Sequence, residues 1–356
     1  MPITRRKTRR VKAGTLEIGG DAQVSVQSMC NSDTRDVEAT KRQIKALAEA
    51  GCQLVRLAVP DMKAAEALEG IVASTDVPLC ADIHFDHRLA LRAIDAGISK
   101  IRINPGNIGS DDRVGEVVKA AAANGIPIRI GVNSGSLPPD LVAKYGRTAT
   151  ALAESALREL SIFERLGFYD TVLSVKSSDV LETVEANRII SSKVDYPLHL
   201  GVTEAGPPDT SMIRSSAALG TLLVDGIGDT IRISMTGDPA IEVRSGKELL
   251  RSLGLIKGLK IVSCPTCGRS RGDVASLVQK VREGLGNLDP DLTVAVMGCE
   301  VNGPGEASDA DFGLACGQGR ASLFKAGELV TRLPYDEAAQ ALVEMIRNVA
   351  TGADRS

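Results

Sequence analysis

Residues 100–132 read KIRINPGNIGSDDRVGEVVKAAAANGIPIRIGV, and this stretch contains the unit from which the fold is built. It begins with the β-type run Lys100–Asn104 and continues through Arg113–Ala123, where apolar residues have helical spacing. It ends with a second β-type run, Pro127–Val132. Because parallel neighbouring strands need a crossover between them, usually a helix, the stretch predicts one strand–helix–strand unit of a parallel sheet.

The same alternation extends along the chain as far as Gly254. Helical segments are expected at Val37–Ala50, Met62–Val72, Arg88–Ala96 and Arg113–Ala123. Eight β-branched runs, each expected to form a strand, lie at Val24–Ser28, Leu54–Val59, Leu79–Ile83, Lys100–Asn104, Pro127–Val132, Thr171–Val175, Pro197–Gly201 and Thr230–Ser234. Eight alternations predict a closed (β/α)8 TIM-like barrel of the α/β class. An open doubly wound sheet is the alternative.

After Gly254 the pattern changes, and we expect a second, smaller α/β domain. A strand at Ile256–Val262 precedes a helix at Asp273–Leu285, and further strands precede a final helix at Tyr335–Val349. We therefore assign residues 1–254 to the barrel and residues 255–356 to the smaller domain.

Three cysteines of the smaller domain lie in two loops that follow predicted strands. Cys264 and Cys267 form a C-x-x-C pair, and Cys299 enters a loop rich in Gly and Pro. A lone C-x-x-C is also compatible with a redox pair, but a third cysteine in a matching loop favours a metal centre.

The spacing does not suit a zinc ribbon, which has two C-x-x-C knuckles about 15–20 residues apart. Three thiolates with one weaker ligand favour an iron–sulfur cluster, whereas a structural zinc site has four firm ligands. From residue types alone, the fourth ligand would be Cys316.

Four predicted barrel strands each place one Arg between two large aliphatic residues. These arginines are Arg56, Arg102, Arg129 and Arg232, and Lys176 follows Val175 in an equivalent place. Because side chains alternate along a strand, aliphatics packed under the helices would leave the cations inside the barrel. Acids such as Asp82 or Glu204 could pair with them in a structural network. We favour an anionic ligand at the C-terminal mouth, a small phosphorylated or diphosphorylated molecule.

Composition excludes several classes of partner. The formal net charge is -3, and the chain has no Trp, four Tyr and five Phe, so we expect no nucleic-acid partner. No run is long enough to span a bilayer, and we expect no membrane association. Seven scattered cysteines predict a reducing, cytoplasmic location. The basic run Arg5–Arg10 is expected to be a solvated or phosphate-touching tail.

Motifs in both predicted domains resemble the 4-hydroxy-3-methylbut-2-enyl diphosphate synthase family, in its bacterial two-domain form. The cysteine loops read Cys264-Pro265-Thr266-Cys267-Gly268-Arg269 and Met297-Gly298-Cys299-Glu300-Val301-Asn302-Gly303-Pro304-Gly305-Glu306. The barrel motifs are Val26-Gln27-Ser28-Met29, Asp82-Ile83-His84-Phe85, Arg102-Ile103-Asn104-Pro105-Gly106-Asn107, Gly131-Val132-Asn133-Ser134-Gly135 and His199-Leu200-Gly201-Val202-Thr203-Glu204-Ala205-Gly206. Cys30 and Glu300 depart from the family pattern.

The resemblance implies a reductive ring opening. Members convert 2-C-methyl-D-erythritol 2,4-cyclodiphosphate to (E)-4-hydroxy-3-methylbut-2-enyl diphosphate and water, with two electrons delivered through a [4Fe-4S] cluster. The implied cluster ligands are Cys264, Cys267, Cys299 and Glu306, so that Cys316 becomes a buried apolar residue. Glu204 is the implied catalytic acid. The implied substrate contacts are Arg56, Asp82, His84, Arg102, Arg129, Asn133, Lys176, Thr203, Arg232 and Ser234.

The expected partners are flavodoxin or ferredoxin as electron donor and a second copy of the chain. The short connection after the barrel makes it hard for a chain to close its cluster domain over its own barrel mouth. We therefore expect a homodimer in which each cluster domain closes on the partner barrel. The competing functions are a zinc-dependent barrel lyase or transferase acting on a phosphorylated small molecule, and a non-catalytic iron–sulfur carrier.

Overall fold

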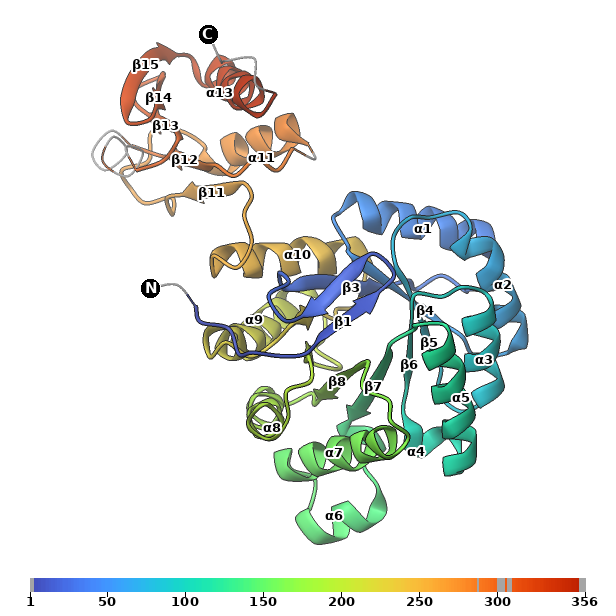
Figure 1. Cartoon of the computed structure of the whole chain (residues 1–356). Coiled ribbons are helices and arrows are strands. Elements are labelled where there is room, and N and C mark those ends of the chain that lie inside the picture. The colour runs from blue at the N-terminus through green and yellow to red at the C-terminus, as the bar shows by residue number, and fades with distance from the viewer. Residues whose placement is uncertain (1–2, 287, 300–304, 306–308, 352–356) are drawn as a thin grey trace. The chain divides into compact units, whose positions relative to one another are not determined.

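The computed structural model describes residues 3–286, 288–299, 305 and 309–351. The chain divides into two compact units, Met1–Ile256 and Lys257–Ser356 (Figure 1). The sequence placed the boundary after Gly254, close to this division, and the functional roles assigned to the two domains stay predictions. Each unit is described by itself.

The first unit is built on an eight-stranded parallel sheet that closes on itself. Its strands are β3 (Ser25–Met29), β4 (Leu54–Ala58), β5 (Leu79–Asp82), β6 (Lys100–Ile103), β7 (Ile128–Asn133), β8 (Thr171–Lys176), β9 (His199–Leu200) and β10 (Thr230–Ile231). They pair in the order β8-β7-β6-β5-β4-β3-β10-β9. Closure between β8 and β9 comes from the Leu173–Leu198 bridge and from Thr203 N, which donates to Ser177 O at 3.1 Å. The predicted (β/α)8 barrel is confirmed.

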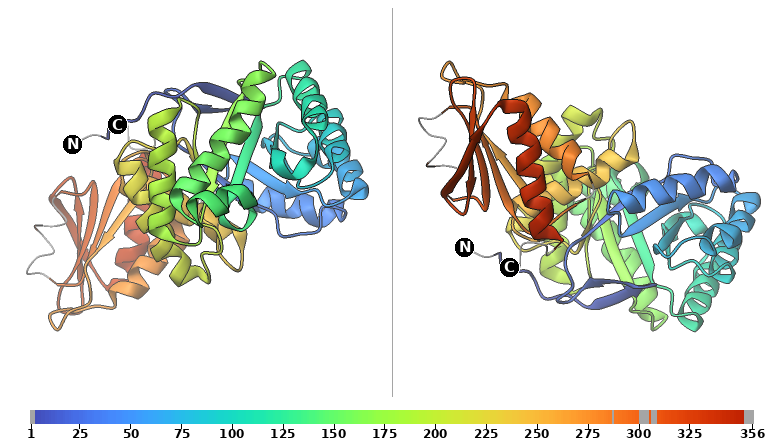
Figure 2. Two further views of the ribbon diagram at one scale, coloured as in Figure 1. Left: turned by 90° about the horizontal axis from the view of Figure 1, so that it is seen from below. Right: turned by 90° about the horizontal axis from the view of Figure 1, so that it is seen from above.

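Helices surround these strands on the outside (Figure 2). They are α1 (Val37–Glu49), α2 (Met62–Val72), α3 (His87–Asp95), α4 (Pro105–Ile108), α5 (Asp111–Ala123), α6 (Pro139–Tyr145), α7 (Ala149–Arg165), α8 (Val180–Lys193), α9 (Pro208–Val224) and α10 (Pro239–Ser252). The four helical segments expected from periodicity correspond to α1, α2, α3 and α5, with ends shifted by at most two residues.

Aspartates fix the starts of many of these helices. The side chains of Asp36, Asp61, Asp86, Asp179 and Asp238 each accept a hydrogen bond from a backbone N–H in the first turn. Such a cap satisfies a donor that has no partner inside the helix and stabilises the helix by about 1 kcal/mol. Each capped helix begins at the end of the loop that follows a barrel strand, so the caps also hold the ends of the loops that form the C-terminal mouth of the barrel.

The other end of the barrel carries a hairpin that sequence periodicity did not reveal. Strands β1 (Arg10–Ala13) and β2 (Leu16–Gly19) are antiparallel, and their buried side chains pack in one cluster with Leu54, Cys80 and Val172. These three residues lie at or next to the N-terminal ends of barrel strands. The hairpin therefore plugs the floor of the barrel and closes it to water from below.

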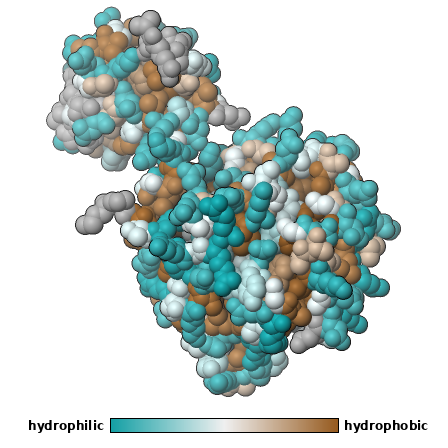
Figure 3. All heavy atoms as spheres, in the orientation of Figure 1, coloured by the Kyte–Doolittle hydropathy of each residue, from teal (hydrophilic) through white to brown (hydrophobic). Residues whose placement is uncertain are grey.

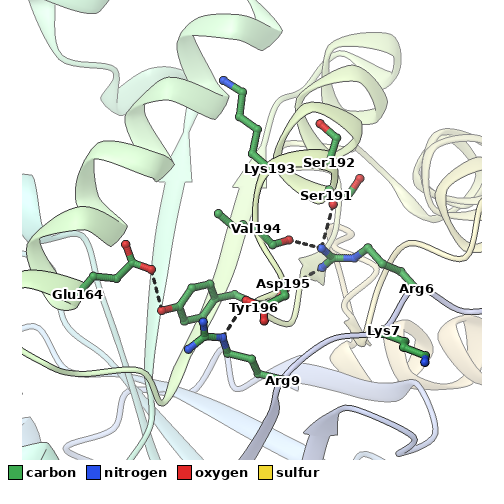
Figure 4. Close-up of a pocket in the computed structure, with 10 residues that line it drawn as sticks. All are labelled: Arg6, Lys7, Arg9, Glu164, Ser191, Ser192, Lys193, Val194, Asp195 and Tyr196. Atoms are coloured by element: carbon green, nitrogen blue, oxygen red, sulfur yellow. Dashed lines mark hydrogen bonds and ion pairs between the residues drawn. The ribbon is translucent and has the colours of Figure 1, made fainter.

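The basic segment before the hairpin is docked on the barrel, and the expectation of a solvated tail is wrong for Arg5, Arg6 and Arg9. Arg5 pairs with Asp229 at 2.8 Å. The guanidinium of Arg6 donates to the carbonyl oxygen of Ser191, in the last turn of α8, and to those of Val194 and Tyr196, just after it (Figure 4). Carbonyls at a helix C-terminus lack partners within the helix, so an arginine there stabilises the end of α8.

Arg9 completes this docked segment. It pairs with Asp195 at 2.7 Å and lies over the ring of Tyr196, 4.4 Å from the ring centre. The hollow of about 480 Å³ that these residues line is therefore on the floor side of the barrel, opposite the C-terminal mouth.

The second unit contains one mixed sheet with two helices on one face. Strands β11 (Lys260–Ser263), β12 (Thr293–Met297) and β13 (Phe312–Cys316) are parallel, and β14 (Ala321–Lys325) and β15 (Glu328–Leu333) continue the sheet antiparallel. Helices α11 (Val274–Leu285) and α13 (Tyr335–Ala350) pack on it around a separate apolar core. The predicted smaller α/β domain is confirmed.

No helix in the described part of the chain is both long enough and apolar enough to cross a bilayer. On the faces of the two units shown in Figure 3, hydrophilic side chains are interspersed with apolar ones.

Arg6→Ala tests the docking of the N-terminal segment. The substitution leaves carbonyl oxygens at the end of α8 without their donor, and we expect a loss of about 1–3 kcal/mol of barrel stability. Urea unfolding followed by circular dichroism measures it. The neighbouring Lys7 is exposed, and Lys7→Ala is the matched control, expected to change stability by less than about 0.5 kcal/mol. Equal stability of the two variants would contradict the assignment.

Candidate active site

The cations predicted to face the barrel interior do so. The aliphatic neighbours of the predicted strand cations belong to the main core between strands and helices, as Ile101 and Ile103 do around Arg102. The cations themselves take the opposite face of their strands. Arg102, Arg129 and Lys176 are 3–6% exposed. Neighbouring strands hold them in register, with Arg102 paired to Arg129 across β6 and β7.

Asp82, at the end of β5, is the first of the acids that meet these cations. Its carboxylate accepts a hydrogen bond from Arg102 Nη1 at 2.9 Å and lies 3.5 Å from Arg56 Nε. Burial alone would raise the pKa of Asp82, but the charges of Arg56 and Arg102 and a hydrogen bond from His84 outweigh it and hold the pKa well below its usual range. Asp82 is therefore ionised and orients two guanidinium groups.

Arg232 has a different acidic partner, Glu242 in the first turn of α10. The two side chains form a bidentate pair with distances of 2.9 and 3.0 Å. Glu242 also accepts hydrogen bonds from Ser28 Oγ at 2.7 Å and from Met235 N at 3.1 Å. A bidentate pair with both carboxylate oxygens used fixes the position of the guanidinium.

Arg129 and Lys176 converge instead on the imidazole of His199, which is fully buried at the start of β9. Arg129 Nη1 lies 3.0 Å from Nδ1 of the ring, and Lys176 Nζ lies 3.3 Å from Nε2. Burial, together with the charges of Lys176 and Arg129, holds the pKa of His199 well below its usual value, so the ring is neutral.

One more buried cation, Lys100, lies deeper in the barrel on the same face as Arg102. Its Nζ has no hydrogen-bond partner among the described residues. Burial lowers its pKa to about 8, with further lowering by the charges of Arg129 and Arg56 and a partial counter-effect of Cys80. In the described barrel, the carboxylates within ion-pair distance of the predicted strand cations are those of Asp82 and Glu242. Positive charge is in excess.

The remaining predicted residues lie in the loops after the strands. Thr203 and Glu204 follow β9, and Ser234 follows β10. Glu204 is exposed and has a φ of 52°, a left-handed conformation that is strained for a residue with a Cβ. His84 is half exposed beside Asp82, and Asn133 is opposite Lys176 in the register of β7 and β8.

Sequence reasoning missed three residues of this site: Lys100, His199 and Glu242. The alternation that selected Arg102 also places Lys100 on the inner face, and this signal was available. His199 was quoted only as part of a motif. Glu242 is on a helix after the last strand, and nothing in its local sequence indicates that it turns toward Arg232.

The cysteine loops lie together at one edge of the second unit. They follow β11 and β12, adjacent parallel strands in which Ser263 pairs with Val296. Gly298 N donates to the sulfur of Cys264 at 3.1 Å, and Arg271 N donates to Gly298 O at 2.7 Å, so backbone bonds tie the loops to each other.

The chemistry of these cysteines suits thiolate ligands. Hydrogen bonds from the backbone and side chain of Arg269 lower the pKa of Cys267, which is exposed. The N–H donor from Gly298 is of the kind that stabilises a cluster sulfur. Among the described residues, no group of three or more His, Cys, Asp or Glu side chains stands close enough to hold a metal ion. Glu306 and Glu300 lie outside the described residues.

Cys316, the ligand that residue types alone suggested, is fully buried in the core between the sheet and its helices. Burial raises its pKa to about 11, and the nearby Cys264 and Cys299 add to the effect. Its sulfur faces Gly272, where a Cβ would lie only 2.8 Å away. The environment is that of a small apolar side chain.

Comparison with known proteins covers both units. Residues 8–247 match the GcpE TIM-barrel domain, and residues 260–348 match the GcpE protein C-terminal domain. A 4-hydroxy-3-methylbut-2-en-1-yl diphosphate synthase (flavodoxin) of Clostridium perfringens is 53% identical over 349 residues, which are 98% of this chain and all of that protein. The synthase of the same name from Geobacter sulfurreducens is 52% identical and aligns over 96% of this chain and 98% of its own length.

Among solved structures, dihydropteroate synthase from Stenotrophomonas maltophilia matches with a TM-score of 0.51 at 18% identity, over 69% of this chain and 98% of that one. At this identity the likeness shows the barrel fold alone. The matches in sequence run through both units at about half identity. The chain belongs to the GcpE family, the 4-hydroxy-3-methylbut-2-en-1-yl diphosphate synthases.

Proposed function

We propose that this protein opens 2-C-methyl-D-erythritol 2,4-cyclodiphosphate to (E)-4-hydroxy-3-methylbut-2-enyl diphosphate. The reaction consumes two electrons and two protons and releases one water. The observation that carries the proposal is the excess of cations over carboxylates inside a closed barrel, because a buried charge without a partner is costly unless a ligand supplies the opposite charge. The relatives from Clostridium perfringens and Geobacter sulfurreducens are named as synthases of the same product.

The barrel cations bind the diphosphate in this proposal. Asp82 holds the guanidinium groups of Arg56 and Arg102, and Glu242 holds that of Arg232, before the ligand arrives, which limits the reorganisation that binding requires. The proposed substrate contacts are Arg56, Asp82, His84, Arg102, Arg129, Asn133, Lys176, Thr203, Arg232 and Ser234. Glu204, exposed at the mouth in a strained conformation, is the proposed catalytic acid that moves a proton at the reacting carbons.

The second unit holds a [4Fe-4S] cluster through Cys264, Cys267, Cys299 and Glu306. When bound, the cluster supplies the electrons of the ring opening. The support is the pairing of β11 with β12, which brings the two cysteine loops to neighbouring strand ends, the hydrogen bond from Gly298 N to the sulfur of Cys264, and the lowered pKa of Cys267. Flavodoxin is the proposed electron donor because the relatives carry it in their names. Anaerobically purified protein should be brown and should convert the cyclodiphosphate with a strong reductant, and failure with cluster present would contradict the proposal.

The active form is proposed to be a homodimer in which each cluster domain serves the partner's barrel. The support is the length of the connection. Leu253, Leu255 and Ile256 pack on the barrel core, and Leu259 packs on the core of the second unit. Only residues 257–258 lie between these two packed segments, and two extended residues span about 7 Å. The last barrel helix, α10, runs toward the barrel floor, so this connection starts far from the mouth of its own barrel.

Arg56→Ala tests the diphosphate site. Losing one charged hydrogen-bond donor should weaken cyclodiphosphate binding by about 1.5–3 kcal/mol, or about 10- to 150-fold in Kd, measured by titration calorimetry. Arg88 pairs with Asp86 on the outside at the start of α3, and Arg88→Ala is the control with unchanged Kd. If the Arg56→Ala and Arg88→Ala variants bound the cyclodiphosphate with equal Kd, the role of Arg56 would be structural. Arg232 is less suitable for this test, because its removal would leave the buried carboxylate of Glu242 without its ion-pair partner.

Cys299→Ala and Cys316→Ala separate ligand from core residue. We expect Cys316→Ala to keep its iron and sulfide content and its brown absorption, because the residue only fills space in the apolar core. Cys299→Ala should lose most of its iron under the same anaerobic reconstitution. Loss of iron from the Cys316 variant with a folded circular dichroism spectrum would make Cys316 the fourth ligand.

Complementation tests the assembly. A Cys299→Ser chain and a Glu204→Gln chain should each be inactive, and mixing them should restore activity as mixed dimers form, since one intact barrel then meets one intact cluster. Two differently tagged chains allow the mixed dimer to be isolated and assayed. An inactive mixed dimer would mean that each chain closes on itself.

A further inference from the structure

The imidazole of His199 lies between two side chains that are ordinarily hydrogen-bond donors. Arg129 Nη1 is 3.0 Å from its Nδ1, and Lys176 Nζ is 3.3 Å from its Nε2. All three side chains are buried, so water does not compete for these contacts. In each of the two contacts, therefore, one group must donate a proton and the other must accept it.

The arginine settles the tautomer of the ring. A guanidinium has donors and no acceptor, and it stays charged at neutral pH even where burial lowers its pKa, as at Arg129. Nδ1 of His199 must therefore accept the hydrogen bond. A neutral imidazole carries its single proton on the other nitrogen, so Nε2–H points at Lys176 Nζ.

The lysine must then be the acceptor. A neutral amine has a lone pair that can accept from Nε2–H, whereas an ammonium group has three protons and no lone pair. If Lys176 were charged, its ammonium protons would point at the proton on Nε2 of His199. If His199 were doubly protonated, the proton on its Nδ1 would point at the N–H groups of Arg129. One protonation state satisfies both contacts: neutral His199 with Nε2–H, and neutral Lys176.

The charges around Lys176 favour the same state. The charged and titratable groups that face it or its neighbours come from every element around the site: Arg56, Asp82, Lys100, Arg102, Arg129, His199, Arg232 and Glu242. Burial, then the charges of Arg129, Arg56, Arg232 and Arg102, lower the pKa of Lys176 well below its usual value. Asp82 and Glu242 are already paired with arginines. Arginines do not release protons, and the other buried lysine, Lys100, makes no hydrogen bond to an imidazole among the described residues. Lys176 is therefore the cation whose neutral form the contact with His199 stabilises.

Gly201, just after β9, leaves the space that the Lys176 amine occupies. A Cβ at this position would lie 2.5 Å from Lys176 Nζ and 2.8 Å from Arg232 O. A side chain there would displace the amine from His199. The contact is thus built into the backbone of two strands.

Given the proposed function, we infer that His199 holds Lys176 as a neutral amine in the ligand-free barrel, and that binding of the cyclodiphosphate takes up one proton from solvent onto Lys176 Nζ. The proton comes from bulk water, because each phosphorus of the cyclic diphosphate has one acidic oxygen that is already ionised at neutral pH. The new ammonium turns to donate to phosphate oxygens and leaves His199. His199 is a positioning residue in this scheme.

The tautomer is measured on ligand-free protein. The chain has three histidines, so a ¹⁵N-histidine spectrum has few signals, and His84→Asn and His87→Gln variants assign those of His199. We expect an unprotonated Nδ1 and a protonated Nε2 for His199, unchanged between about pH 6 and pH 8, a range that covers the ordinary histidine pKa. A protonated Nδ1, or a ring that titrates in this range, would overturn the inference whether or not the cyclodiphosphate binds.

Proton uptake is measured by calorimetric titration with the cyclodiphosphate in buffers of different ionisation enthalpy. We expect uptake approaching one proton per ligand above neutral pH and an affinity that falls by up to about tenfold per pH unit there. Lys176→Met should bind weakly with no such uptake. Lys193 is an exposed lysine paired with Glu154, and Lys193→Met is the control, expected to keep the proton uptake of the parent chain. Binding without uptake by the parent chain overturns this inference, whereas absence of binding contradicts the proposed function.

Discussion

The alternation of side chains along parallel strands is the constraint on which the rest of this structure depends. Aliphatic residues on one face of each strand pack under the helices, and the residues between them have no choice but to enter the barrel. In this chain they include Arg102, Arg129 and the lysines Lys100 and Lys176. The hydrophobic packing that closes the barrel therefore also concentrates positive charge within it, and stability and ligand binding arise from the same strands.

The scaffold manages this charge in two ways. Asp82 pairs with two arginines and Glu242 with one, and Glu242 is itself fixed by hydrogen bonds from Ser28 and the backbone of Met235. The hairpin β1–β2 closes the floor with apolar side chains, which keeps water away from the cations and leaves the C-terminal mouth as the open end. Fixed donors that are buried from most of the solvent interact with an anion more strongly than they would in bulk water.

The sequence predicted what depends on local pattern and missed what depends on packing between distant segments. Strand alternation correctly placed Arg56 and Lys176 on the inner face, and the β-type runs correctly placed Cys264 and Cys299 in loops after strands. Nothing in the local sequence links Arg6 to the carbonyls after α8 or Glu242 to Arg232, because those contacts exist only once the barrel has closed. The basic run was misjudged for this reason: charge density alone does not tell a solvated segment from one docked on helix ends.

The pairing pattern also explains why the barrel uses both arginine and lysine. Guanidinium groups give fixed, permanently charged donors, and three of the predicted strand arginines are held by carboxylates. A lysine among them can lose its charge when no anion is present, which lowers the electrostatic free energy of the empty barrel. Replacing that lysine by arginine would keep the charge in the empty site and remove the acceptor that His199 requires. The geometry of the triad therefore favours lysine at this position on physical grounds, independently of the contacts it makes to a ligand.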